Sequence, residues 1–236
     1  MKYQAVIFDL FGTLIDSFST REYERALADM ARFLSAPAEK FVELWMATYD
    51  GRATGQFETT ARCVEHVCAE LGLRPSSQQI AAAAQMRLDF TRQGLVPRDG
   101  SIETLTWLKR HAYKTGLISD CAAEVPLLWP TTPLCPLIDV PIFSCSVGLK
   151  KPDPRIYLLA CERLGVKPEK CIYVGDGGSR ELSGAAALGM HPIMIRLPDD
   201  QSDAHRLDTE DWPGDQVAEL REVTAFLECP DQRDQA

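Results

Sequence analysis

Side chains able to bind a metal ion and a phosphoryl group follow short apolar runs at several places in the chain. Asp9 follows the run VIF, Ser119 and Asp120 follow GLI, Asp176 follows IYVG, and Lys151 lies just beyond FSCSV. Ligands of open α/β sheets bind outside the carboxyl ends of the strands, so we expect these residues to meet at one sheet edge. Carboxylates hold a hard cation, and a lysine and a hydroxyl bind phosphoryl oxygens. The pattern predicts a site for a magnesium ion and a phosphoryl group.

Apolar runs that alternate with helical patterns must position these residues. Strands are expected at residues 4–8, 114–119, 171–175 and 192–197, with a weaker candidate at 142–146. Helices are expected at 101–111, from Asp153-Pro154 to Gly165, at 179–188 and at 216–227. The prolines between residues 126 and 141 exclude a long regular element there. Alternating strands and helices predict an α/β fold with a Rossmann-like parallel sheet covered on both faces.

Residues 17–93 carry only helical signals. A capping box, Ser19-Thr20-Arg21-Glu22, opens the first of four amphipathic patterns, and the other three start near residues 37, 57 and 76. Short connections between the four favour a small helical bundle. We therefore expect a discontinuous α/β core at residues 1–16 and 94–230, an inserted helical-bundle cap domain at 17–93, and a frayed tail at 231–236.

The overall composition narrows the class of protein. The chain has 236 residues, of which 45% are hydrophobic and 25% charged, and its formal net charge of -9 is unlike that of a nucleic-acid binder. No run of about 18 apolar residues predicts a membrane span, and the N-terminus does not resemble a signal peptide. The eight cysteines form no C-x-x-C pair and match no zinc site. We expect a cytoplasmic protein with reduced cysteines that acts on a small molecule; its oligomeric state stays open.

Four segments also carry a family resemblance. FDLFGTL at residues 8–14, LIS at 117–119, GLKKPDP at 148–154 and YVGDGGSREL at 173–182 occur in this order. They resemble the four motifs of the haloacid-dehalogenase-like (HAD) superfamily, and the helical insert is similar to the C1 cap of its subfamily I. The resemblance covers nearly the whole core, and it implies a hydrolase that uses an aspartate nucleophile and Mg2+.

The resemblance also implies a role for each matched residue. Asp9 would attack the substrate and form a covalent intermediate, and Thr13 would support it through its hydroxyl. Ser119 would bind the transferring group, Asp120 would contact the substrate, and Lys151 would pair with Asp9 and with the oxygens of the group.

The metal ligands follow from the same resemblance. Asp9, the main-chain carbonyl of Phe11 and Asp176 would bind Mg2+, and Glu181 would complete the set. Glu181 stands where the fourth motif normally has a second aspartate, and it is one methylene longer. It could reach the ion through water, or it could hold Lys151.

Phe11 is the larger departure from the motif. Phosphatases of the superfamily have an aspartate there as general acid and base, and phenylalanine cannot transfer a proton. Loss of such a group lowers the rate by about 10^2 to 10^4 unless another group replaces it. The best interpretation is a Mg2+-dependent phosphatase that acts on a small phosphorylated metabolite.

Two alternatives stay open at this point. True 2-haloacid dehalogenases carry a tyrosine at the position of Phe11, but they lack the aspartate that corresponds to Asp176. They also use an arginine of the cap, and the comparable place here, Trp45-Met46, has none. An HAD fold without its acid could instead be a non-catalytic binding or regulatory protein. Arg52, which follows the second helix of the insert, is expected to lie in a solvated turn, with a position facing the pocket as the alternative.

Overall fold

The computed structural model describes residues 2–196 and 209–228. Its centre is a single parallel sheet with strand order β3-β2-β1-β4-β5-β6. The strands are β1 (Ala5–Phe8), β2 (Lys114–Ser119), β3 (Val140–Phe143), β4 (Cys171–Gly175), β5 (His191–Ile195) and β6 (Gln216–Val217). The chain builds outward from β1 to β3 on one side and from β4 to β6 on the other. The strand order therefore reverses between β1 and β4, which is the place where open α/β sheets bind ligands.

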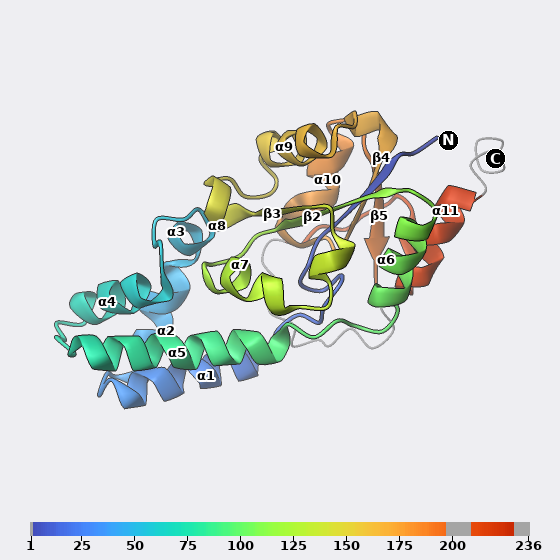
Figure 1. Ribbon diagram of the computed structural model, residues 1–236. Helices are drawn as coiled ribbons and strands as arrows, with labels where there is room; N and C mark the ends of the chain where they lie inside the picture. The colour runs from blue at the N-terminus through green and yellow to red at the C-terminus, as the bar shows by residue number, and fades with distance from the viewer. Residues whose placement is uncertain (1, 197–208, 229–236) are drawn as a thin grey trace.

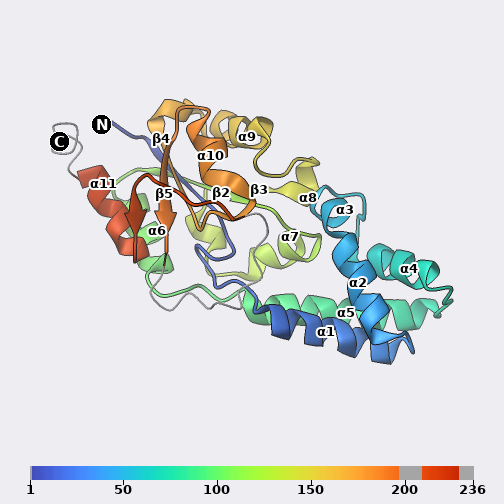
Figure 2. The same ribbon diagram turned by 180° about the vertical axis from the view of Figure 1, so that it is seen from behind.

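Helices cover both faces of the sheet, as Figures 1 and 2 show. On one face lie α9 (Pro154–Leu164) and α10 (Glu181–Ala186), and on the other lie α6 (Ser101–Arg110) and the C-terminal turn and helix. Strand β1 is buried along its whole length, and its alternate residues enter two separate apolar clusters, Val6 and Phe8 in one and Ala5 and Ile7 in the other. This burial on both faces explains why the run is continuously apolar. The predicted Rossmann-like α/β fold is confirmed.

A helical insert (residues 17–93) lies beyond one edge of this core in both views. Its helices are α1 (Thr20–Phe33), α2 (Ala38–Ala47), α3 (Tyr49–Ala53), α4 (Thr60–Glu70) and α5 (Ser77–Gly94). Ser19 caps α1 by accepting a bond from the Glu22 N–H, and Ser76 forms a full capping box with Gln79 on α5. The insert has an apolar cluster of its own, centred on the fully buried Phe41 and Trp45. This separate packing supports the division into core and cap, which stays a prediction in its bounds.

Two adjacent chain segments join the insert to the core. Ile15, on the way out, forms an antiparallel bridge with Pro97, on the way back. The Leu14 carbonyl accepts bonds from the Arg98 N–H at 3.0 Å and from the Ser101 hydroxyl at 2.7 Å. The chain therefore leaves and re-enters the core at one place, beside the end of β1.

Several predicted elements differ in their bounds. The predicted helix at 216–227 is wrong at its start, because Gln216 and Val217 extend the sheet beside Met194 and Ile195 of β5. A 3-10 turn at Leu220–Thr224 and a short helix α11 (Ala225–Glu228) follow. Hydrogen bonding to the open edge of β5 and burial of Val217 stabilise a strand there more than the helical pattern stabilises a helix. The second predicted helix is divided at Thr48, whose hydroxyl donates to the Trp45 carbonyl at 2.7 Å.

The strand candidate at 142–146 and the helix predicted at 179–188 are also shifted. Strand β3 begins at Val140 and includes Pro141, which an edge strand tolerates because one of its sides needs no ladder bonds. It gives way to a single helical turn, α8 (Ser144–Val147). Helix α10 begins at Glu181, after Ser179 and Arg180 in the left-handed region. The predicted tail at 231–236 lies outside the described residues.

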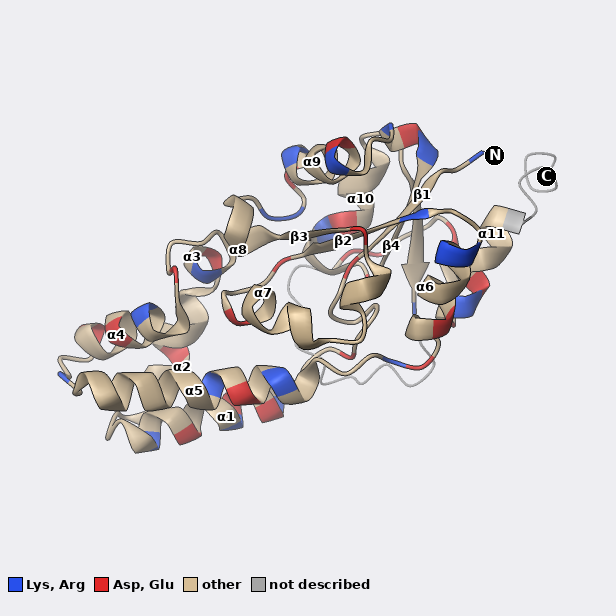
Figure 3. Cartoon of the chain, in the orientation of Figure 1, with Lys and Arg blue, Asp and Glu red and all other residues tan. Residues whose placement is uncertain are grey.

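Acidic and basic residues are interspersed along the helices, as on the core-facing end of α5 (Figure 3). No helix among the described residues has the length and apolar character that a membrane crossing requires.

Candidate active site

A cavity of about 140 Å³ lies where the carboxyl ends of the strands face the helical insert. Asp9, Asp120, Lys151 and Asp176 of the core line it. All of the strand ends singled out in the sequence therefore contribute to one site, because the parallel strands end at the same edge. The volume is close to that of an engineered cavity of about 150 Å³ that holds benzene, so the space suits a small ligand.

The Lys151 ammonium lies between two carboxylates at the bottom of the site. Its Nζ donates to Asp9 Oδ1 at 2.5 Å and to Glu181 Oε2 at 2.6 Å, and all three side chains are at least nine-tenths buried. Burial alone would lower the pKa of Lys151, but Asp9 and Glu181 outweigh it and hold the pKa well above its usual value. Lys151 is therefore a fixed positive charge beside Asp9.

Glu181 is held from several sides. The Tyr173 hydroxyl donates to its Oε2 at 2.8 Å, and the Gly177 N–H donates to its Oε1 at 3.1 Å. Gly175 leaves room for this carboxylate, because a Cβ at that position would lie 2.0 Å from Glu181 Oε1. The sequence places Glu181 at the start of α10, directly after the loop that follows β4, so it points back toward the strand ends.

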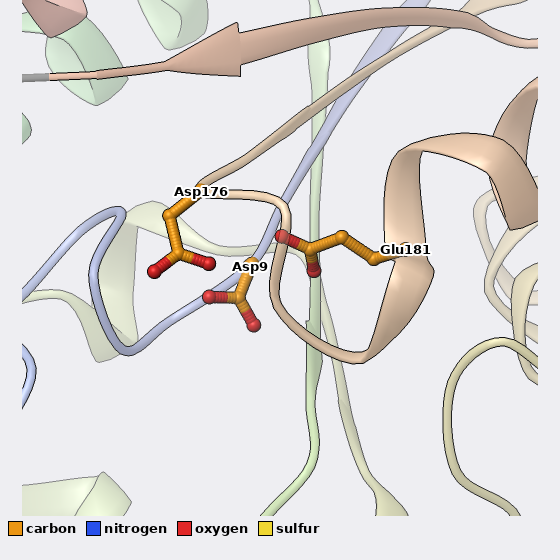
Figure 4. Close-up of side chains that lie close together, drawn as sticks. All are labelled: Asp9, Asp176 and Glu181. Carbon is orange, nitrogen blue, oxygen red and sulfur yellow. The ribbon is translucent and has the colours of Figure 1, made fainter. Parts of the chain in front are cut away.

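Asp176 completes a buried acidic group with Asp9 and Glu181. One carboxylate oxygen from each of the three lies within 4.8 Å of the others, and Figure 4 shows Asp9 between the other two. The Gly178 N–H donates to Asp176 Oδ1 at 3.0 Å. Gly12 has a φ of 81°, and a Cβ there would lie 2.1 Å from Asp176 Oδ2. The turn after Asp9 therefore closes tightly over Asp176.

The hydroxyl groups predicted for the site differ in their surroundings. Ser119 is fully buried with its hydroxyl beside the Cys121 thiol, and Thr13 Oγ1 has no hydrogen-bond partner in the part of the chain that the structure describes. The support of Asp9 by Thr13 therefore stays a prediction. Asp120 Oδ1 accepts a bond from the Lys151 N–H at 3.0 Å, which ties the end of β2 to the lysine loop. Burial raises the pKa of Asp120, and this effect outweighs the neighbouring Lys151.

The helical insert supplies the opposite wall of the cavity. The expectation that Arg52 lies in a solvated turn is wrong, since it is 6% exposed, lines the cavity and stacks on the Trp45 ring. Its burial follows from the break at Thr48, which turns α3 inward and lets Arg52 Nε donate to the Thr48 hydroxyl at 3.0 Å.

Sequence reasoning missed Arg87 of α5 and Glu124, the first residue of α7 (Glu124–Leu128). Both line the cavity and are buried. A signal for Arg87 was present: it stands seven residues after Ile80, on the helical face that also carries Ala84 and Thr91. A charge on an inward face indicates a site or a buried pair. Glu124 follows a turn, and no periodicity marked it.

Comparisons with known proteins place this geometry in a family. The model of the haloacid dehalogenase-like hydrolases matches residues 3–189. The chain belongs to this family. It is therefore a hydrolase.

Individual relatives carry two kinds of name. The chain is 28% identical to a glyceraldehyde 3-phosphate phosphatase of Methanopyrus kandleri over 95% of this chain and 98% of that protein. It is 24% identical to an (S)-2-haloacid dehalogenase of a Pseudomonas species over 81% and 84%. The crystal structure of a HAD phosphatase from Thermococcus onnurineus superposes with a TM-score of 0.65, at 24% identity over 95% of this chain and 98% of that one, which supports the fold. The choice between phosphate and halide chemistry must come from the site itself.

Proposed function

We propose that the protein is a Mg2+-dependent phosphatase that acts on a small phosphorylated metabolite, with Asp9 as the nucleophile. The observation that carries this proposal is Asp176, a second buried carboxylate with an oxygen within 4.8 Å of one on Asp9. Displacement of halide by a carboxylate needs no metal ion, whereas a metal-assisted phosphoryl transfer needs carboxylates that hold one.

The residues around Asp176 fit a magnesium ion. Mg2+ is bound in proteins by one or two carboxylates together with phosphate oxygens and water. Asp9 and Asp176 would be those carboxylates, and the Phe11 carbonyl, in the turn that Gly12 folds against Asp176, would be a third ligand. Bound there, the ion would neutralise phosphoryl oxygens and lower the repulsion between the substrate and the Asp9 carboxylate.

Asp9 and Lys151 would carry the two chemical steps. An oxygen of Asp9 forms a bond to phosphorus while the bond from phosphorus to the ester oxygen breaks, and the leaving oxygen takes up a proton from solvent water to become an alcohol. Water then attacks the phosphorus of the aspartyl phosphate, which releases inorganic phosphate and restores the carboxylate. Lys151 would hold the attacking carboxylate and bind the phosphoryl oxygens, and the hydroxyl of Ser119 would donate to one of them.

The bonds of Glu181 favour one of the two roles that the sequence left open. Both of its oxygens already accept hydrogen bonds, from Lys151, Tyr173 and Gly177. We propose that it holds Lys151 in place, and that any part it takes in metal binding runs through water.

The packing of Phe11 gives a structural reason for the departure from the phosphatase motif at this position. Its ring lines the cavity and packs against the Phe18 ring of the insert, with 5.2 Å between the centroids. Phe11 therefore packs against the insert, whereas an aspartate at this position would transfer a proton. Slow turnover of substrates with poor leaving groups is the expected consequence.

A dehalogenase is the second candidate, and two observations favour it: Phe11 itself, and the 24% identity to an (S)-2-haloacid dehalogenase. A non-catalytic role is less compatible with the site. A buried Lys151 between two carboxylates costs folding free energy, and catalysis gives such an arrangement a use that offsets this cost.

The test is hydrolysis of p-nitrophenyl phosphate and of a panel of phosphorylated metabolites, run beside release of chloride from 2-chloropropionate. We expect phosphate release that stops in EDTA and returns with added Mg2+. Chloride release that persists in EDTA would replace the phosphatase with the dehalogenase. Absence of turnover in every assay, with a folded protein, would favour the binding protein. The cytoplasmic location stays a prediction of the sequence.

A further inference from the structure

An arginine and a glutamate face each other across the boundary between the insert and the core. Arg87 Nε of α5 lies 3.6 Å from Glu124 Oε1 of α7, with side-chain exposures of only 7% and 3%. Neither of these two atoms has a hydrogen-bond partner among the residues that the structure describes. A buried ion pair is stable only when its remaining hydrogen-bonding groups are satisfied, so this pair is incomplete as it stands.

Aromatic rings fix the direction of Arg87. Its guanidinium carbon lies 4.6 Å from the centroid of the Tyr23 ring and 5.2 Å from that of the Phe90 ring, and Phe18 lies at 6.0 Å. These rings prevent the guanidinium from turning away toward solvent. Arg87 and Glu124 also line the cavity that Asp9 and Lys151 line, so the incomplete pair lies in the wall of the space in which a substrate would sit.

The neighbouring arginine has a different use. Three nitrogens of Arg52 donate within the insert, to the Thr48 hydroxyl at 3.0 Å, the Trp45 carbonyl at 3.3 Å and the Tyr23 hydroxyl at 3.4 Å. Burial raises the pKa of Tyr23, but the two guanidinium groups, Arg87 first and then Arg52, outweigh it and leave the pKa below its usual value. The hydrogen bonds of Arg52 therefore stabilise the wall of the cavity, whereas Arg87 and Glu124 still have hydrogen-bonding atoms that a ligand could satisfy.

We infer that Arg87 and Glu124 together recognise a hydroxyl group of the substrate, so that the preferred substrates are small phosphate esters of polyols. This inference rests on the proposed phosphatase function. A hydroxyl is neutral, and it can accept a bond from a guanidinium while it donates one to a carboxylate. It therefore completes both halves of the pair at once.

Charged groups fit the same place less well. A carboxylate that reached Arg87 would also approach Glu124, and two like charges in a poorly solvated cavity repel each other. An ammonium group would meet the same difficulty with Arg87 and Arg52. An alkyl group would leave the donor and the acceptor unpaired.

Three substrates with the same three-carbon chain test the inference. They are glycerol 1-phosphate, n-propyl phosphate, which lacks the hydroxyls, and 3-phosphooxypropionate, which carries a carboxylate. We expect wild-type kcat/KM for glycerol 1-phosphate to exceed that for each of the others by about tenfold or more, the size of an effect from hydrogen bonds to charged groups. Equal values, or a preference for n-propyl phosphate, would overturn the inference.

The variant Glu124→Gln gives a result that misfolding cannot imitate. It keeps an acceptor oxygen and removes the negative charge, so Arg87 is left ready for an anion. The ratio of kcat/KM for 3-phosphooxypropionate to that for glycerol 1-phosphate should rise by about tenfold. The matched control is Asp89→Asn, the same change of acid to amide at an exposed position of α5, which should leave the ratio at its wild-type value. A change of less than about twofold in Glu124→Gln would contradict the inference.

Binding to Asp9→Asn separates this inference from the proposed function. Calorimetric titration of that variant with glycerol 1-phosphate and n-propyl phosphate measures recognition without turnover. If wild type hydrolyses neither ester while Asp9→Asn binds the first more tightly, the phosphatase proposal fails and the recognition of a hydroxyl stands. Equal affinity of Asp9→Asn for both esters would contradict the recognition itself.

Discussion

The core half and the insert half of the cavity use buried charge in opposite ways. In the core, Lys151 makes bonds of 2.5 Å and 2.6 Å to two carboxylates, and Tyr173 and Gly177 hold the second of them. On the insert side, Arg87 of α5 faces Glu124 of the core helix α7 with 3.6 Å between Nε and Oε1, and neither atom has a hydrogen-bond partner in the part of the chain that the structure describes. The hydrogen bonds of Lys151 and Glu181 in the core half are formed before a ligand arrives, whereas Arg87 Nε and Glu124 Oε1 have no hydrogen-bond partner among the described residues.

This difference assigns separate tasks to the two halves. A closed network of charges cannot rearrange cheaply, which suits groups that must hold one geometry throughout a reaction. An open pair gains hydrogen bonds only from a ligand of the right chemistry, which suits discrimination between substrates. Changes in the core half should therefore alter kcat for all substrates, and changes in the insert half should alter the ratio between substrates.

The largest expected effect is that of Asp9→Asn in the core half. Asparagine is nearly isosteric but is a far poorer nucleophile, so turnover of every substrate should fall below about 1% of wild type. Circular dichroism and the thermal midpoint report whether the fold is intact. Turnover above that level, in protein free of wild-type contamination, would rule out Asp9 as the covalent nucleophile.

Phe11 lies at the contact between the two halves. The variant Phe11→Asp should therefore change the relative rates of alkyl and aryl phosphates. Alkyl phosphates need a proton on the leaving oxygen and should be slow in wild type, whereas aryl and acyl phosphates leave more readily. The added carboxyl should narrow the gap between alkyl and aryl esters, by a factor that approaches about 10^2. If wild type hydrolyses alkyl phosphates rapidly and the variant is slower, another group supplies the proton and Phe11 serves only to pack against Phe18.

Tyr173→Phe tests whether the closed network matters for rate. The change removes the hydroxyl that donates to Glu181 Oε2 at 2.8 Å and leaves the ring in place. We expect kcat to fall by about tenfold, the equivalent of one hydrogen bond to a charged group. The loss should be the same for glycerol 1-phosphate and n-propyl phosphate. A loss confined to one of these esters would break the division of tasks between the halves.

Asp139→Asn, remote from both halves, should have the smallest effect. Burial raises the pKa of Asp139, but bonds from the Lys109 side chain and the Thr115 N–H outweigh it and leave the pKa below its usual value. A carboxylate with a lowered pKa stabilises the fold above about pH 4 and loses this effect as the pH falls through its folded pKa.

The urea midpoint of wild type should therefore exceed that of Asp139→Asn at pH 7. Because the pair of Asp139 and Lys109 is partly exposed, the difference in the free energy of unfolding should be at most about 1 kcal/mol. This difference should vanish as the solution is acidified. The ratio of kcat/KM between substrates should stay at its wild-type value. A gap that widens in acid would contradict the assigned sign.

The two halves also differ in how far the sequence predicts them. Strands β2 and β4 occur at the predicted residues, and the polar residues that follow parallel strands meet at one edge whatever the details of the loops. Topology alone thus brings Asp9, Lys151 and Asp176 together.

Contacts that depend on how elements pack against one another follow no such rule. Arg87 and Glu124 lie on different elements, 37 positions apart in the chain, and only the packing of α5 against α7 makes them neighbours. The inward turn of Arg52 depends on a break at Thr48 that helical periodicity does not reveal. The strand at Gln216 depends in the same way on an open sheet edge, which is a property of the assembled fold.

The bridge between Ile15 and Pro97 has a consequence for how such a protein evolves. Because the two junctions are adjacent, residues between them can be exchanged by recombination as one block, with both ends joined to an unaltered core. A graft of this kind would carry a new substrate-binding wall to an existing nucleophile in a single event. Laboratory libraries can follow the same route, with shuffled inserts displayed on one constant core and selected for new specificities.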